Sequence, residues 1–109
     1  PGVALPDLPI TVVVRKDGDG TTNVWTDYLS KASAAWKEKV GAGDSVNWPV
    51  GVQARKNRGV ADLVSRTSGG IGYVELSHAL ATKLPHGAVR NRHGVYVEAS
   101  VKSITAAAA

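Results

Sequence analysis

The sequence predicts an α/β fold in three layers, with a mostly parallel sheet flanked by helices. Two observations lead to this prediction. Runs rich in Val, Ile and Thr alternate along the chain with segments whose apolar residues recur at helical spacing. The 109 residues, of which 43% are hydrophobic, are enough for one small domain over residues 1–109 with its own core.

The first strand and the helix after it form the clearest unit. Residues 10–15 are nearly continuous in apolar, β-branched character, as expected of a buried parallel strand. Residues 17–20 interrupt this run with two glycines. A helix over about residues 21–32 follows, and Thr21 or Thr22 can cap it. Its predicted inward face consists of Val24, Trp25, Tyr28, Leu29 and Ala32.

The middle of the chain continues the alternation after an irregular lead-in at residues 1–8. In chain order we expect a helix at 34–40, a short strand at 45–48, a basic loop at 53–58, a helix at 59–65, a strand at 71–74 and a helix at 75–83. The inward residues predicted for the helix at 59–65 are Val60, Leu63 and Val64, and the apolar residues of the helix at 75–83 are Leu76, Ala79 and Leu80.

The last part of the chain predicts a pair of short strands and a helix. The strands lie near residues 88–90 and 95–97, and the turn between them contains Gly94. The tail from Ser100 favours a helix by composition, and its four final alanines are the only low-complexity stretch. Strands that alternate with helices in this way imply βαβ units.

The turn after the first strand is the strongest candidate site, for an anion. Backbone N–H groups at a helix start lack partners, the helix dipole adds partial positive charge, and glycines allow close approach. Arg15 ends the strand and can offer a bidentate fork to a phosphate, with Asp17 orienting it. The turn lacks the Walker spacing and the third glycine of a dinucleotide fingerprint. An ordinary capped turn is the alternative interpretation.

A second candidate is the basic loop that contains Arg55, Lys56 and Asn57. It can supply a secondary anion contact, or it can be a solvated charged loop. No aromatic residue is interleaved with the basic ones, and the net charge is only +4. Both observations argue against nucleic acid as a partner.

Several classes of chemistry find no support in these residues. The 109 residues contain no cysteine, which excludes disulfides, thiolate metal sites and a cysteine nucleophile. The histidines, His78, His86 and His93, are too widely separated to predict a metal site. No serine stands in a nucleophile elbow, and no carboxylate pair stands out except Asp17 and Asp19. We therefore expect no enzyme activity, no metal and no cofactor.

The sequence shows no long apolar segment that could span a membrane, no initiator methionine and no signal peptide. Its uncharged apolar runs are too short to span a bilayer. It begins with Pro1 and Gly2 rather than Met and carries no signal peptide, so we expect a processed, excised or trimmed chain.

Six blocks of sequence resemble the phosphate-binding proteins of bacterial phosphate ABC transporters. In order they are PITVVVRKDG at 9–18, GTT at 20–22, TDYLSK at 26–31, AWKEKVG at 35–41, VNWPVG at 46–51 and IGYVE at 71–75. The resemblance covers nearly the whole chain in order. It implies the fold of a type II periplasmic binding protein, in which two α/β lobes close over phosphate. This chain resembles part of the second lobe only.

The resemblance also implies a set of phosphate contacts. In the family motif R-x-D-x-S-G-T, the arginine, serine, glycine and threonine contact phosphate. The matching residues here are Arg15, Asp19, Gly20 and Thr21, and Asp17 matches the aspartate of the motif. Asp19 replaces the serine, and an ionised carboxylate repels phosphate unless it is protonated, turned away or facing a bound cation. The basic loop departs too, since three family glycines are absent and Arg58 replaces an acid.

The function that the resemblance implies is phosphate binding for transporter-mediated uptake. The implied partners are inorganic phosphate, the N-terminal lobe that this chain lacks and a membrane permease. The implied location is periplasmic, secreted or at the cell surface. An alternative is an interaction module that has lost phosphate binding and associates, or self-associates, through its basic loop or exposed lobe face. A third hypothesis, a phosphatase or nuclease, has little support, because the sequence offers no candidate nucleophile and no metal ligands beyond Asp17 and Asp19.

Overall fold

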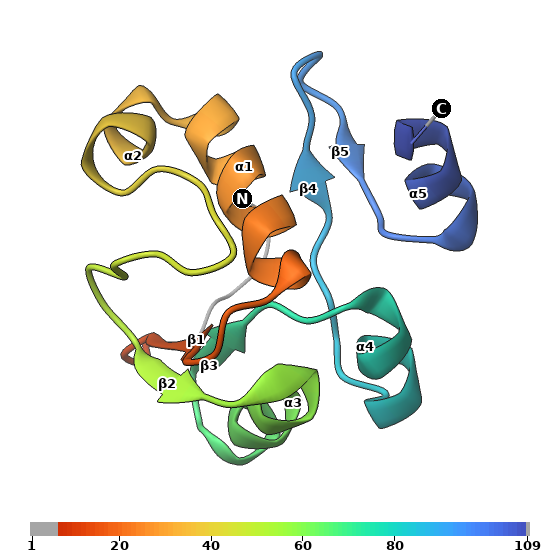
Figure 1. Ribbon diagram of the computed structural model, residues 1–109. Helices are drawn as coiled ribbons and strands as arrows, with labels where there is room; N and C mark the ends of the chain where they lie inside the picture. The colour runs from red at the N-terminus through yellow and green to blue at the C-terminus, as the bar shows by residue number, and fades with distance from the viewer. Residues whose placement is uncertain (1–6, 109) are drawn as a thin grey trace.

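A three-stranded parallel sheet lies at the centre of the computed structural model, which describes residues 7–108 (Figure 1). Its strands are β1 (Thr11–Arg15), β2 (Val52–Ala54) and β3 (Gly70–Gly72), in the order β2-β1-β3. Val13 lies opposite Val52 on one side of β1 and opposite Gly72 on the other. The strongly β-branched strand is therefore the central one, as its apolar run predicts.

Helices flank this sheet, and a small antiparallel ribbon lies apart from it. The further elements are α1 (Gly20–Ala32), α2 (Ala34–Lys39), α3 (Lys56–Arg66), α4 (Leu76–Thr82), β4 (Val89–Arg90), β5 (Tyr96–Val97) and α5 (Val101–Ala108). Figure 1 shows α3 against one side of the sheet and α1 rising on the other. The ribbon β4–β5 stands beside α1, where the Tyr28 hydroxyl donates to the Arg90 carbonyl at 2.8 Å. The predicted α/β class is confirmed.

The core is small and lies between β1 and α3. Its buried apolar residues among those described are Val13, Val14, Val60, Ala61 and Ala79. A row of aromatic rings extends this packing toward α2. Trp48 lies 5.6 Å from Tyr73 and 5.7 Å from Trp36 between ring centroids, at tilted angles that suit aromatic pairs. These rings tie the loop after α2 to the segment after β3.

The strand predicted at 45–48 is wrong. Residues 46–48 have no regular structure, and Trp48 serves as a packing residue in the aromatic row. The second strand begins only at Val52, after Pro49 and after Gly51, which takes a φ of +130° close to the side chain of Val14. The predicted basic loop at 53–58 is also wrong, because its first half ends β2 and its second half is the first turn of α3.

Three of the five residues predicted to face inward on α1 are half-buried, and the prediction is wrong for the other two. Val24 is 74% exposed and Ala32 is exposed, whereas Thr22 and Thr26 are the buried residues of the helix. The buried hydroxyls have partners, since Thr26 Oγ1 donates to the Thr22 carbonyl at 2.7 Å and accepts from the Gly43 N–H at 3.1 Å. The helix therefore turns a polar stripe inward, which apolar periodicity cannot detect.

The other predicted elements fall close to the observed ones. The inward residues of α3 are confirmed, with Val60 buried and Leu63 and Val64 half-buried. The predicted helix at 75–83 is observed as α4, in which Ala79 is buried and Leu80 is 58% exposed. Most of the lead-in at residues 1–8 lies outside the described residues.

Gly72 offers a direct test of the packing between β1, β3 and α3. A Cβ at this position would lie 2.9 Å from Val60 Cγ1 and 3.1 Å from the Val13 carbonyl oxygen. We expect Gly72→Ala to lower the free energy of unfolding by about 1–3 kcal/mol, measured by urea denaturation, because the core must be displaced. Gly87→Ala is the matched control, since no atom lies within 4 Å of its added Cβ. Equal stability of the two variants would show that α3 does not pack as described.

Candidate functional site

The strands that follow β1 in the sequence, β2 and β3, lie on opposite sides of it, so the carboxyl end of β1 is a switch point of the sheet. The path from β1 leads first to β2 on one side and then, through α3, to β3 on the other. In open parallel sheets such a switch point is where ligands bind. Segments after all three strands meet there: residues 15–21 after β1, 55–57 after β2 and 73–75 after β3.

The guanidinium of Arg15 is the centre of this edge. Arg15 is only 5% exposed. Its Nε and Nη2 donate to the two carboxylate oxygens of Asp17 at 3.0 and 2.7 Å, and its Nη1 donates to Asp19 Oδ2 at 3.0 Å. Planar bidentate pairing of this kind fixes orientation as well as charge. The prediction that Asp17 orients the guanidinium is confirmed.

Each of the two aspartates also satisfies the start of a helix. Asp19 is the N-cap of α1, and its Oδ2 accepts the Thr21 N–H at 2.9 Å. The predicted caps, Thr21 and Thr22, are therefore wrong by two or three residues. Asp17 Oδ1 accepts the Lys56 N–H at 3.0 Å, at a helix start where Arg55 provides no side-chain cap. One arginine thus holds the carboxylates that serve both α1 and α3.

Tyr73 is a positioning residue that the sequence analysis missed. Its hydroxyl oxygen accepts the Arg15 backbone N–H at 3.2 Å and shares a hydrogen bond of 2.7 Å with Thr22 Oγ1. Nearby, Asn57 Oδ1 accepts the Glu75 N–H at 3.1 Å. The available signal was position alone, since Tyr73 follows the third predicted strand and must lie at the same edge as Arg15.

The pKa shifts of Arg15, Asp17 and Asp19 favour the charged form of each side chain. Hydrogen bonds from Arg15 hold the pKa of Asp17 well below its usual range, and Asp17 in turn raises the pKa of Arg15. The hydroxyl and backbone N–H of Thr21 lower the pKa of Asp19. At neutral pH the cluster holds one positive and two negative charges. The structure shows an arrangement of Asp19 that the sequence analysis did not consider, in which it pairs with Arg15 of the chain itself and not with a bound cation.

The remaining predicted residues surround this cluster to different degrees. Gly20 is the first residue of α1, with open space around its α-carbon, and Thr21 is half-buried. The backbone N–H of Lys56 and the side chain of Asn57 belong to the hydrogen-bond network, while Arg55 is exposed.

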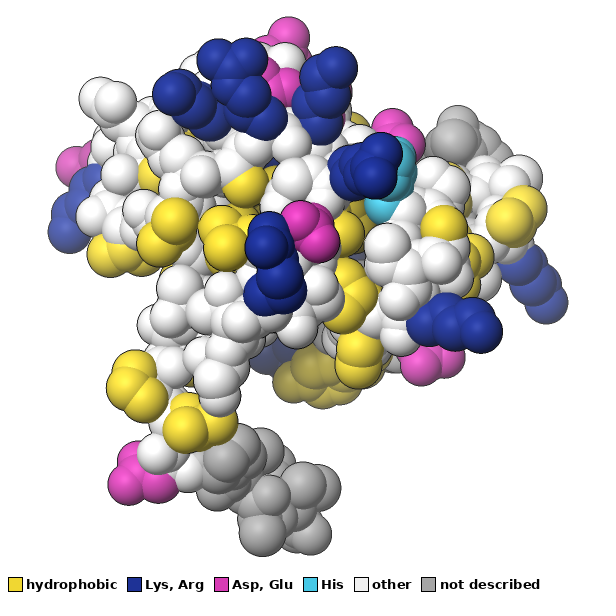
Figure 2. Space-filling model, turned by 90° about the horizontal axis from the view of Figure 1, so that it is seen from below, with side chains coloured by type: hydrophobic (Ala, Val, Ile, Leu, Met, Phe, Trp, Pro, Cys, Tyr) yellow, Lys and Arg dark blue, Asp and Glu magenta, His cyan; other side chains and the backbone are white. Residues whose placement is uncertain are grey.

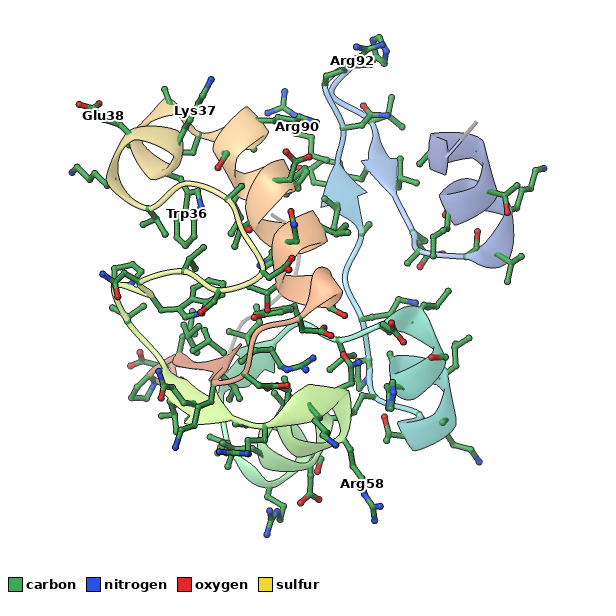
Figure 3. All side chains as sticks on the ribbon, viewed as in Figure 1. Trp36, Lys37, Glu38, Arg58, Arg90 and Arg92 are labelled. Carbon is green, nitrogen blue, oxygen red and sulfur yellow. The ribbon has the colours of Figure 1, made fainter. Side chains whose placement is uncertain are left out.

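Basic side chains are also a feature of the neighbouring surface. Figure 2 looks onto the side of the molecule that carries α3 and shows Lys and Arg side chains gathered along one margin. Arg58 points outward from the start of α3, away from α1 (Figure 3). It is therefore not part of the cluster around Arg15.

The described part of the chain shows no cluster of metal ligands and no membrane-spanning helix. Within residues 7–108, no three His, Asp or Glu side chains come together as metal ligands. None of the helices in that range has the length and apolar character needed to cross a membrane.

Comparison with known proteins identifies the family. The model of the PBP superfamily domain matches residues 3–109. The chain belongs to this superfamily. The PBP domain described here has relatives named phosphate-binding protein PstS. That of Xylella fastidiosa is 51% identical over 108 residues, which are 99% of this chain and 30% of the relative. That of Pasteurella multocida is 49% identical over 99% of this chain and 31% of the relative. That of Methanocaldococcus jannaschii is 44% identical over 94% of this chain and 28% of the relative. The PBP domain thus spans less than a third of each.

The lowered pKa of Asp17 predicts an acid-sensitive fold. Because its pKa is lower in the folded chain than the usual value of about 3.9, Asp17 stabilises the fold above about pH 4 and loses this effect as the pH falls further. We expect Asp17→Asn to cost about 2 kcal/mol at pH 7 and to flatten the pH dependence of unfolding between about pH 4 and 2.

Urea denaturation at a series of pH values measures both effects. Asp62→Asn is the matched control, because Asp62 pairs with Arg66 on the exposed surface of α3 and such pairs contribute little. An unchanged pH dependence in Asp17→Asn would contradict the role of this carboxylate.

Proposed function

We propose that this chain binds inorganic phosphate at the turn of residues 15–21, as a lobe of a solute-binding protein for phosphate uptake by an ABC transporter. The observation that carries the proposal is the buried guanidinium of Arg15, held at the carboxyl edge of the sheet beside the start of α1. The name of the relatives, phosphate-binding protein, supports the same ligand.

The proposed contacts combine one full charge with helix-start donors. Arg15 uses three of its five N–H groups on the two aspartates, which leaves two available for a ligand. Gly20 and Thr21 add backbone N–H groups at the positive end of α1, and Thr21 adds its hydroxyl. Arg55, Lys56 and Asn57, at the start of α3, are proposed as the secondary contacts. Binding rests on hydrogen bonds alone and involves no chemical step.

The wider setting follows from this role. The proposed partners are an opposing lobe, which would exclude water from the anion, and the membrane permease of the transporter. Uptake places the protein outside the cytoplasm, in the periplasm or at the cell surface. Because water competes for the anion at an open edge, the 109-residue chain alone is expected to bind weakly, with a dissociation constant on the order of 1 mM.

Titration calorimetry with phosphate and with sulfate tests the proposal. We expect Arg15→Gln to weaken phosphate binding at least about tenfold, since the only buried cation of the edge is lost. Thr21→Val, which keeps the Thr21 backbone N–H and both ion pairs of Arg15, should weaken it roughly threefold to tenfold through loss of the hydroxyl. Arg66→Gln is the matched control, because Arg66 pairs with Asp62 on the exposed side of α3.

Two results would contradict phosphate binding at this turn. One is the absence of heat with millimolar phosphate for the wild-type chain and for every variant of the turn. The other is equal affinity of Thr21→Val, Arg66→Gln and the wild-type chain, with circular dichroism showing that all three are folded.

A second candidate role, association through the sheet, is favoured by apolar residues that the described structure leaves uncovered. They lie on or beside the three strands and are Ile10, Val50, Val52 and Ile71. If they form an interface, sedimentation velocity should show dimers that increase with concentration, and Val52→Glu should abolish them. A monomer at every concentration would count against self-association.

A further inference from the structure

The Asp19 carboxylate already receives the two donors that an anion would need at this edge. Its Oδ2 lies 3.0 Å from Arg15 Nη1 and 2.9 Å from the Thr21 backbone nitrogen. One of these is a charged guanidinium donor and the other is a helix-start N–H. This combination is typical of oxyanion binding in proteins.

We propose that Asp19 Oδ2 occupies the place of one oxygen of the bound anion, so that phosphate binds only by displacing this carboxylate. The inference rests on the proposed phosphate site and adds a residue that sets its affinity. Asp19 is then an internal competitor for the ligand and not one of its contacts.

The two aspartates differ in how firmly they are held. Both oxygens of Asp17 are engaged, one by Arg15 Nη2 and the other by Arg15 Nε and the Lys56 N–H, so its removal would release the start of α3 as well. Asp19 uses one oxygen, Oδ2, for both Arg15 and Thr21. Exposure does not distinguish the two, since the side chains of Asp17 and Asp19 are 32% and 31% exposed. Rotation of the short Asp19 side chain can free both donors without moving β1 or α3.

The like charge of the two anions makes displacement necessary. A carboxylate and a phosphate that share the same donors repel one another strongly at an edge that is partly shielded from water. The Asp19 carboxylate and phosphate could occupy this position together only if they shared a proton. Displacement requires only that the ligand offer a better set of oxygens to Arg15 and Thr21 than Asp19 does.

Substitution at Asp19 tests this inference, with inorganic phosphate as the probe. Asp19→Ser removes the competing carboxylate but retains an N-cap hydroxyl for α1, so the fold should persist. We expect it to bind phosphate at least about tenfold more tightly than the wild-type chain by titration calorimetry. Asp62→Asn, which removes one negative charge from the exposed surface of α3, should leave the affinity unchanged.

Asp19→Asn separates occupation of the position from charge. Its amide oxygen can still accept both N–H groups, so displacement predicts an affinity between those of wild type and Asp19→Ser. An affinity of Asp19→Asn equal to or above that of Asp19→Ser would overturn displacement in favour of simple repulsion.

The remaining outcomes distinguish the two proposals. Equal or weaker binding by Asp19→Ser overturns this inference alone, because the carboxylate is then a bystander or a direct ligand. Binding by Asp19→Ser with none by the wild-type chain supports both proposals. No binding by any of the three proteins overturns both.

Discussion

The fold depends on one buried cation that two aspartates share. Arg15 ends the central strand, and burial of its charge is tolerated only because carboxylates pair with three of its N–H groups. Those same carboxylates complete the starts of α1 and α3. A single guanidinium therefore links the central strand to a helix on each side of the sheet. Loss of the cation would leave two negative charges close together and two helices poorly anchored.

Polar pairing shapes this edge where a larger domain would use apolar packing. The core contains mainly small residues, and the inward stripe of α1 consists of Thr22 and Thr26. Tyr73 connects this stripe to the backbone of Arg15, and its ring belongs to the aromatic row with Trp48. The result is an edge whose donors are fixed in advance, and pre-organised donors are what anion recognition needs.

The sequence reveals local features of this arrangement and misses the distant ones. The β-branched run and the glycine break locate β1 and α1, and the pairing of Arg15 with Asp17 follows from two residues of separation. The hydrogen bond from Arg15 to Tyr73 spans 58 positions, so it depends on the strand order, which composition does not determine. The start of β2 is misplaced because Trp48, typical of strands, packs in a loop instead.

The same donors, the Arg15 guanidinium and the Thr21 N–H, serve both the stability of the fold and the proposed binding of an anion. The two aspartates affect stability and binding differently. The contacts of Asp17 with Arg15 and the Lys56 N–H do not involve Asp19, so the proposed displacement leaves their stabilising effect in place. With the proposed displacement, Asp19 stabilises only the empty chain, because its contacts with Arg15 and Thr21 are those that an anion would take. Whatever free energy Asp19 adds to the unliganded fold therefore opposes ligand binding by a similar amount, by thermodynamic linkage. Such a trade-off is expected wherever a side chain of the protein imitates its ligand. A serine at this position offers a neutral hydroxyl to the helix start and leaves the guanidinium N–H for the anion.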